Sequence, residues 1–316
     1  MFLKKLMMIV SLFALAVIPA AAQEETERPE AWDADHTQER FYWHDKWFTP
    51  FMASQVDPRF SYGLYVPVDY DENGDKEYPL VVLIHGTERS PGQYLRFNEE
   101  FAEEKDVILL APMFPVGTHG QYDLENYKLI EHQGTRYDLI LLSMVDEVAT
   151  KYRIDSTRFY LHGFSGGGHF AHRFYYLHPH RLKALSIGAA GMITRPNLEK
   201  DWWVGVKDLK WRFNARVNFD RMRQVPVQIV IGEEDNESWA QFSEIERHSP
   251  YRMEYEPDAT YTAAGDGRLD RAKTLMADYE EIGIDVRMDI VPDAGHDETL
   301  MAPTVQTFFS EFLAED

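Results

Sequence analysis

The sequence contains no cysteine among its 316 residues. This absence excludes disulfides, a thiol nucleophile and thiolate metal sites, so the fold depends on its hydrophobic core. Basic residues are also scarce, because 32 Lys and Arg stand against 53 Asp and Glu, a net charge of −21. A surface this acidic repels phosphate backbones and anionic membranes, so we expect no nucleic-acid partner. Acidic surfaces are common among exported proteins, so the net charge indicates little more about the function.

A long apolar run occurs only at the N-terminus. Lys4 and Lys5 precede the 13-residue run LMMIVSLFALAVI, and PAAA follows it before Gln23. This order is typical of a secretory signal peptide, here residues 1–22, and an uncleaved anchor is the alternative. A bilayer core takes about 20 apolar residues, so we expect cleavage after Ala22 and no stable membrane anchor afterwards. The mature protein is therefore expected to be secreted or periplasmic, with a net charge of −23.

A regular alternation of strand and helix patterns begins near residue 59. We therefore expect an acidic, then aromatic N-terminal segment at 23–58 and one domain at 59–316. The alternation predicts an α/β fold, with a mostly parallel central sheet and helices on both of its faces. The expected strands cover 60–68, 79–86, 106–114, 156–165, 182–191, 225–235 and 285–296, and the expected helices cover 93–104, 137–152, 166–177, 268–284 and 304–314.

The stretch YLHGFSGGGHF contains the pattern G-x-S-x-G, with Ser165 at its centre. A serine at a sharp strand-to-helix turn presents its hydroxyl above the sheet, and side chains two positions to either side would clash with the neighbouring elements. Gly163 and Gly167 occupy these two positions. The pattern alone is weak, since about one random chain in ten of this length would contain it. Its place between an apolar strand and a helix predicts that Ser165 is a nucleophile.

The stretch LIHGT ends an earlier buried strand. A loop in this position supplies one backbone donor of an oxyanion hole, and the residue after the nucleophile supplies the other. We therefore predict the amides of Thr87 and Gly166 as the two donors. The alternative is an ordinary strand-to-loop glycine, Gly86, with His85 beside it.

Two further stretches offer an acid and a base. VIGEED ends a strand with three acids, Glu233, Glu234 and Asp235. We predict that Asp235 is the catalytic acid, because the G-x-x-acid spacing lets the loop turn first, and Glu234 is second. VPDAGH follows the last strand, and His296 there gives the order nucleophile, acid, base of such hydrolases. His248 is the only other histidine downstream of the acid.

Together these motifs resemble the α/β-hydrolases. Within that superfamily, VVLIHGT, YRIDSTRFYLHGFSGGG and PDAGH are similar to polyhydroxybutyrate depolymerases and to feruloyl and acetyl-xylan esterases. The resemblance covers about residues 60–313 by order of elements and these three stretches by residue. It implies a serine esterase of small or polymeric ester substrates that needs no metal or organic cofactor. The chain departs from secreted relatives, which often carry disulfides, and the tryptophan-rich segment after Ser186 matches nothing in the family.

Two other functions remain open at this stage. A serine peptidase related to the prolyl oligopeptidases would share the catalytic domain, but the residues before 59 leave no room for a β-propeller. A non-catalytic binding protein on the same scaffold would lack a member of the triad, and none is missing. The sequence leaves the acyl group, the alcohol and the oligomeric state open.

Segments 194–224 and 236–267 interrupt the alternation of strands and helices. Both follow the carboxyl ends of strands, where such sheets bind ligands, so we expect inserted loops over that edge. Their tryptophans form either an aromatic wall for the substrate or the small core of an inserted cap, and both interpretations stay open. We predict substrate contact for Trp202, Trp203 and Trp239, and Trp211 belongs to the same group.

Four histidines follow the proposed nucleophile, at positions 169, 172, 178 and 180. His169 and His172 are three residues apart and share a helix face, which is one requirement of a metal site. No carboxylate completes a ligand spacing, so we predict no metal. We expect helix capping and solvent exposure to account for these histidines.

Overall fold

A nine-stranded sheet runs through the part of the chain that the structure describes. The structure is a computed structural model, and it describes residues 45–121, 123–236 and 264–313. All of these belong to one compact unit, residues 41–316. The predicted signal peptide and Trp239 lie outside the described residues, as do His248 and residues 23–44 of the predicted N-terminal segment.

The strand order is β1-β3-β5-β4-β8-β9-β10-β11, and β2 also pairs with β3. Six neighbouring strands of the sheet are parallel, namely β5, β4, β8, β9, β10 and β11. Strand β3 is antiparallel to β1, β2 and β5. This agrees with the predicted mostly parallel sheet. The strands are β1 (Trp47–Phe48), β2 (Met52–Ala53), β3 (Ser61–Val66), β4 (Leu80–Ile84), β5 (Ile108–Met113), β8 (Phe159–Phe164), β9 (Leu182–Gly188), β10 (Val227–Gly232) and β11 (Val286–Val291).

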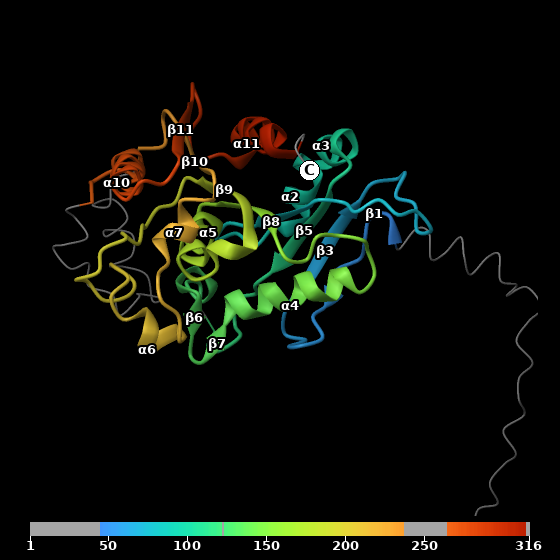
Figure 1. Cartoon of the computed structure of the whole chain (residues 1–316), viewed down its shortest axis with the longest axis horizontal. Helices are drawn as coiled ribbons and strands as arrows, with labels where there is room; N and C mark the ends of the chain where they lie inside the picture. Colours follow the sequence, from blue (N-terminus) through green and yellow to red (C-terminus); the bar gives the residue numbers. More distant parts are fainter. Residues whose placement is uncertain (1–44, 122, 237–263, 314–316) are drawn as a thin grey trace, which may run out of the picture. The chain divides into compact units, whose positions relative to one another are not determined.

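Helices cover both faces of the sheet, which confirms the predicted α/β class (Figure 1). On one face, α11 (Glu298–Leu313) packs beside α2 (Pro91–Phe97) and α3 (Glu99–Lys105). The other face carries α4 (Tyr137–Ala149), α5 (Gly166–Leu177) and α10 (Arg268–Glu281), and the ring of Tyr279 in α10 contacts Tyr175 and Tyr176 of α5. Shorter elements complete the described part: η1 (Tyr127–Leu129), β6 (Glu131–His132), β7 (Thr135–Arg136), η2 (Pro179–Arg181), α6 (Leu209–Phe213) and α7 (Phe219–Met222).

Strand β8 shows why the central strands are mostly apolar, with His162 as a buried polar exception. All six of its residues are buried. Successive side chains point to opposite faces of a strand. Accordingly, Phe159 packs against Phe174 of α5, whereas Tyr160 packs against Phe309 of α11. Because helices cover both faces of the sheet, apolar side chains are favoured on both faces of the strand.

Two expected helices differ markedly from the prediction, whereas α4 and α10 each end three residues earlier than expected. The helix expected over 93–104 is two helices, α2 and α3, which meet at Asn98. The Asn98 side chain donates to the carbonyl of Tyr94, a local bond that competes with helix continuation. The last helix begins at Glu298 rather than at residue 304, and Pro303 lies inside it. Buried Met301 and Ala302 extend the apolar face of this helix on the N-terminal side of Pro303.

The first strands belong to the segment predicted at 23–58. Strand β1 pairs with β3 at Trp47 and Phe48, and β2 pairs with β3 at Met52 and Ala53. The last part of that segment therefore forms an edge of the sheet. Among the described residues, no helix has both the length and the hydropathy needed to cross a bilayer.

The order of the strands places the site. After β4 the chain forms β5 on one side, and it then crosses back to form β8 on the other side of β4. Strands β4 and β8 are parallel neighbours, with Ile84 opposite Gly163. Loops that leave such a reversal point in different directions open a crevice at the carboxyl ends of the strands. Thr87 follows β4 and Ser165 follows β8, so the fold brings both to this crevice.

Candidate active site

Ser165 occupies the turn between β8 and α5 with strained backbone angles, φ 54° and ψ −113°. The glycines around it permit this turn. A Cβ on Gly163 would overlap the carbonyl of Gly167, and a Cβ on Gly167 would overlap the carbonyl of Ile84 in β4, both well within the 3.0 Å that real Cβ atoms respect. The predicted clash at these two positions is confirmed. The backbone of the turn thus packs directly on β4, with no space for side chains.

Ser165, His296 and Asp235 form one hydrogen-bonded row. The Oγ of Ser165 lies 2.9 Å from Nε2 of His296, and Nδ1 of His296 lies 2.6 Å from Oδ2 of Asp235. The Asp235 side chain is fully buried, whereas the His296 side chain is 28% exposed. Phe164 stacks near the imidazole at a ring distance of 4.7 Å. The other two acids of the same loop, Glu233 and Glu234, are exposed.

The second oxygen of Asp235 contacts an arginine that the sequence analysis did not single out. The Nη1 of Arg268 lies 2.5 Å from Oδ1 of Asp235, and only 7% of the Arg268 side chain is exposed. Burial alone would raise the pKa of Asp235, but the hydrogen bond and charge of His296, together with Arg268, outweigh it and lower that pKa below its ordinary value. The carboxylate is therefore ionised at neutral pH.

His85 fixes the loop that follows β4. The amide of Phe114 donates to Nε2 of His85 over 3.0 Å, so this nitrogen carries no hydrogen. The hydrogen is then on Nδ1, which donates to the carbonyl of Gly86 over 2.7 Å. Burial lowers the pKa of His85 to about 4, which keeps the ring neutral. Because the N–H and C=O of a trans peptide point in opposite directions, this bond also sets the direction of the Thr87 amide.

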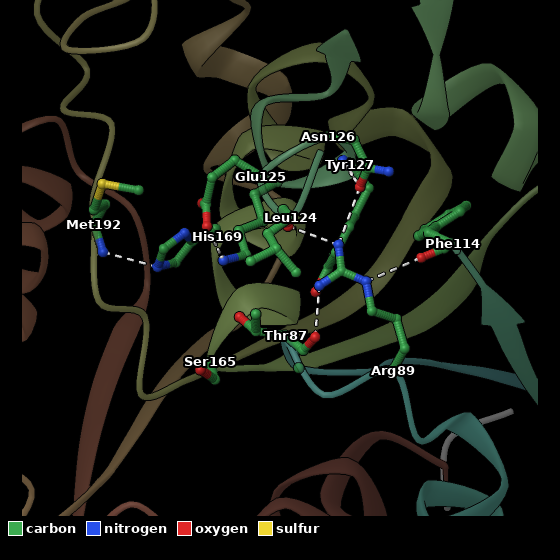
Figure 2. Close-up of polar contacts among 12 residues, drawn as sticks. Thr87, Arg89, Phe114, Leu124, Glu125, Asn126, Tyr127, Ser165, His169 and Met192 are labelled. Atoms are coloured by element: carbon green, nitrogen blue, oxygen red, sulfur yellow. Dashed lines mark hydrogen bonds and ion pairs between the residues drawn. The ribbon is translucent and has the colours of Figure 1, made fainter. Parts of the chain in front are cut away.

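Arg89 holds the same loop from the other side (Figure 2). Its guanidinium donates to the carbonyl of Thr87 over 2.5 Å and to the carbonyl of Leu124 over 2.6 Å. It also reaches the carbonyl of Phe114 at 3.3 Å and the side chain of Asn126 at 3.2 Å. These bonds tie the loop after β4 to the end of β5 and to the turn before η1.

Thr87 and Gly166, the two predicted oxyanion donors, are neighbours. Figure 2 shows Thr87 beside Ser165, although the two come from different loops. A Cβ on Gly166 would lie 3.1 Å from Oγ1 of Thr87 and 2.5 Å from the hydroxyl of Tyr127. The fold thus brings these two residues together next to the serine. Their role as donors stays a prediction.

No known protein-family profile matches the sequence, and no curated protein is recognisably similar to it. Solved structures of similar fold exist. Poly(aspartic acid) hydrolase-1 from Sphingomonas sp. KT-1 superposes with a TM-score of 0.61 at 22% identity, over 78% of this chain and 92% of that one. The poly(3-hydroxybutyrate) depolymerase LpqC from Bordetella parapertussis gives 0.61 at 20%, over 80% and 84%. A ferulic acid esterase gives 0.55 at 16%, over 84% and 95%.

The chain has the α/β-hydrolase fold. The resemblance to depolymerases and feruloyl esterases, predicted from three short motifs, is confirmed at the level of the fold. Identities of 16–22% carry no further statement about this chain.

The tryptophans of the segment at 194–224 have different surroundings. Trp203 is buried against Met192, and its ring lies 5.3 Å below the guanidinium of Arg173, so it belongs to a small core of the inserted segment. Trp202 is half-buried and donates from Nε1 to the carbonyl of Leu129. Trp211 is 93% exposed and therefore does not belong to that core. Substrate contact by Trp202 and Trp203 stays a prediction, and that of Trp239 lies outside the described residues.

The expectation that His169 and His172 are explained by capping and exposure is wrong. Both rings are buried, and each accepts at Nε2 from a backbone amide, that of Met192 for His169 and that of Thr194 for His172. The α5 helix is buried along its whole length, because the loop at 190–194 covers its outer side. Burial, followed by the charge of Arg173, lowers the pKa of both rings well below the ordinary value.

The other two histidines of that group, His178 and His180, lie at the end of α5. His178 bonds Oδ2 of Asp138 at 2.7 Å, and His180 is exposed as expected. Within the described ranges, no group of three or more histidines or carboxylates is arranged to hold a metal ion.

Sequence reasoning missed two residues of the site. His85 was assigned to the right loop but without its two hydrogen bonds, and the dipeptide His85-Gly86 at the end of a buried strand was a signal for it. Arg268 begins a helix 33 residues after Asp235, and nothing in its local pattern distinguishes it from an exposed helix residue.

Proposed function

We propose that this α/β-hydrolase is an exported serine esterase that cleaves carboxylic esters through an acyl-enzyme on Ser165. One observation carries the proposal: a strained serine lies in line with an imidazole and a buried, ionised carboxylate. A serine hydroxyl is a poor nucleophile unless a base takes its proton as it attacks. This row supplies the base and fixes its tautomer.

In the first half-reaction, Oγ of Ser165 attacks the ester carbonyl and Nε2 of His296 takes its proton. The tetrahedral oxyanion is stabilised by the amides of Thr87 and Gly166, each of which lowers the barrier by about 3 kcal/mol in comparable sites. The intermediate collapses as the imidazolium returns the proton to the leaving alcohol. Water then attacks the acyl-enzyme by the same route and releases the acid.

Asp235 accepts the Nδ1 hydrogen of His296 and stabilises the imidazolium that forms. It does not take the proton itself, since its pKa is lowered by its two charged partners. The bond at 2.6 Å is short, as expected for a charge-assisted hydrogen bond.

The substrate class is the least specified part of the proposal. Proteins of this fold include a poly(3-hydroxybutyrate) depolymerase and a ferulic acid esterase, which supports small or polymeric carboxylic esters. We propose that Trp202, Trp203 and Trp239 contribute to the acyl or alcohol pocket. The predicted signal peptide at 1–22 supports export, and detection of a processed N-terminus at Gln23 in the extracellular or periplasmic fraction tests it.

Two variants test the central proposal. Ser165→Ala is expected to abolish hydrolysis of short p-nitrophenyl esters and labelling by a fluorophosphonate. Ser310→Ala is the matched control, because its hydroxyl bonds only within α11, to the carbonyl of Gln306. Labelling that persists in Ser165→Ala at another residue would overturn the assignment.

The acid is tested in the same assay. Asp235→Asn is expected to lower kcat by about 10⁴-fold, by analogy with other Ser-His-Asp enzymes, because the imidazole then adopts the wrong tautomer. Glu234→Gln, its exposed neighbour, is expected to retain activity. Proline-containing peptide anilides assayed beside the esters separate the esterase from a peptidase, and a wild-type protein that reacts with no fluorophosphonate would favour a binding protein.

A further inference from the structure

The carboxylate of Asp235 has two side-chain partners, one on each oxygen. His296 occupies Oδ2 at 2.6 Å and Arg268 occupies Oδ1 at 2.5 Å. We propose that Arg268 is a positioning residue of the active site, which holds Asp235 in place for His296 and tunes the charge that the imidazole experiences. The inference rests on the proposed function, because it gives Arg268 a part in the same triad.

The two contacts restrict the rotation of the Asp235 carboxylate. A carboxylate held through one oxygen can rotate about its Cβ–Cγ bond, whereas one held through both cannot. The arginine–carboxylate pair is buried, with 7% and 0% of the two side chains exposed, so water does not compete for Oδ1. Arg268 therefore keeps Oδ2 aimed at the Nδ1 hydrogen of His296, and this fixes the tautomer in which Nε2 faces Ser165.

The charge of Arg268 also acts on the imidazole of His296. An unscreened negative charge 2.6 Å from the imidazole favours its protonated form. A guanidinium on the far oxygen offsets that charge. Loss of the guanidinium should therefore favour protonation of the imidazole, which then cannot accept the serine proton. Because the guanidinium offsets part of the Asp235 charge, the carboxylate stabilises the imidazolium less during the reaction.

Most of the other charged groups on the packed elements are exposed, whereas Arg268 is buried. Glu233 and Glu234 on the loop of Asp235, Asp293 and Asp297 on the loop of His296, and Asp266 before α10 are all exposed. Solvent screens such charges strongly. His169 of α5 is buried nearby, and the charge of Arg268 is one cause of its lowered pKa, so that ring is neutral as well. Two further charged groups nearby are buried: Glu298 at the start of α11, bonded to His162, and Lys128, paired with Glu125. Among the described residues, Arg268 is the buried cation that contacts Asp235.

The same ion pair joins two distant parts of the chain. Asp235 follows β10, and Arg268 is the first residue of α10. Their neighbours also approach closely, because a Cβ on Gly267 would lie 2.7 Å from Oδ1 of Asn236. The start of α10 is therefore fixed against the loop that carries the catalytic acid.

Three substitutions separate geometry from charge. Arg268→Met removes both the donor and the charge, Arg268→Gln keeps a donor without the charge, and Arg268→Lys keeps the charge. Arg195→Met is the matched control, since Arg195 forms a comparable ion pair at 2.5 Å with Asp278 of the same helix but does not touch the triad. The pH profile of kcat/KM for a p-nitrophenyl ester is measured for each variant, with thermal unfolding to establish that it is folded.

We expect the acidic limb of the profile to move upward by about one pH unit in Arg268→Met and Arg268→Gln, because the imidazole loses a nearby cation. Arg268→Met should also lose at least tenfold in plateau kcat, and Arg268→Gln less. Arg268→Lys should keep the limb of the wild type, and Arg195→Met should keep both limb and plateau. The proposal is overturned if Arg268→Gln keeps the acidic limb of the wild type and a plateau within twofold of the wild type. If Arg268→Met does not fold, Arg268→Gln and Arg268→Lys decide the question.

A second measurement separates this inference from the proposed function. The imidazole of His296 is titrated by NMR in Ser165→Ala and in Ser165→Ala with Arg268→Gln, neither of which needs to be active. A higher titration midpoint in the double variant supports the role of Arg268 even if the wild type hydrolyses no ester. Equal midpoints overturn it even if the wild type is an efficient esterase.

Discussion

The Nε2 atom of His85 accepts the amide hydrogen of Phe114 over 3.0 Å, so that one neutral imidazole links the ends of β4 and β5 beneath the loop of Thr87. Its other nitrogen holds the carbonyl of Gly86. The direction of the Thr87 amide therefore depends on a side chain that is fully buried.

We expect His85→Phe to lower kcat by about 10 to 100-fold with little change in KM, because a misdirected oxyanion donor loses part of the 10²–10³-fold that one donor contributes. Steady-state kinetics on a p-nitrophenyl ester measure this. His132→Phe is the control, since His132 lies in the β6–β7 hairpin. A change confined to KM would contradict the assigned role.

A methyl group at Gly167 tests the close packing of the elbow. The added Cβ in Gly167→Ala would overlap the carbonyl of Ile84, so the turn has to shift. We expect a loss of about 1–3 kcal/mol in the free energy of unfolding, as for other overpacked sites, and at least 100-fold in kcat. Gly120→Ala is the control, because a Cβ there meets nothing within 4 Å. Equal activity of the two variants would show that the contact does not constrain Ser165.

Acid should destabilise this protein through its buried histidines. The folded-state pKa values of His85, His169 and His172 are lowered from 6.5, to about 4 for His85, chiefly by burial. Between these values the unfolded chain binds more protons than the folded one, so the free energy of unfolding falls as the pH drops from 6.5 toward 4. Each ring contributes at most about 2 kcal/mol of loss at pH 5.

Urea titrations at pH 7, 6 and 5 measure this loss. His172→Gln keeps an acceptor for the Thr194 amide without a basic ring. Its unfolding free energy should therefore depend less steeply on pH, by up to about 1.4 kcal/mol per unit. Parallel curves for the variant and the wild type would exclude this ring as a source of acid sensitivity.

Trp203 and Trp211 should respond differently to truncation. Trp203→Ala leaves a cavity beside Met192 and removes the ring beneath Arg173, so we expect a loss of about 3–5 kcal/mol in stability. Trp211→Ala changes a side chain that is 93% exposed and should shift stability by less than about 0.5 kcal/mol. Thermal and urea unfolding measure both. A neutral Trp203→Ala would remove the argument that this ring forms a core.

Much of the fold follows from local patterns. The continuous apolar run of β4, the glycines after β8 and the spacing of α5 all follow from local requirements, so their bounds could be predicted closely. The same holds for the candidate row of serine, acid and base, because each residue ends a strand in a known order. The structure brings these three side chains within hydrogen-bond distance of one another.

The rest depends on tertiary contacts. His169, His172 and Arg173 gave α5 a polar appearance, and only the loop that covers the helix makes these residues internal. Arg268 needs the fold to approach Asp235, because the two positions are 33 residues apart in the chain. Sequence periodicity reports which face of an element is apolar, but it does not report which distant backbone amide or carboxylate satisfies a buried ring or guanidinium.

The ion pair between Asp235 and Arg268 also bears on how the sequence between them can vary. It clamps both ends of the stretch 236–267 beside the triad. The entropy of closing a chain between two fixed points grows only slowly with the number of residues between them. Chimeras that exchange this stretch while keeping Asp235 and Arg268 should therefore retain the hydrogen-bonded row of Ser165, His296 and Asp235.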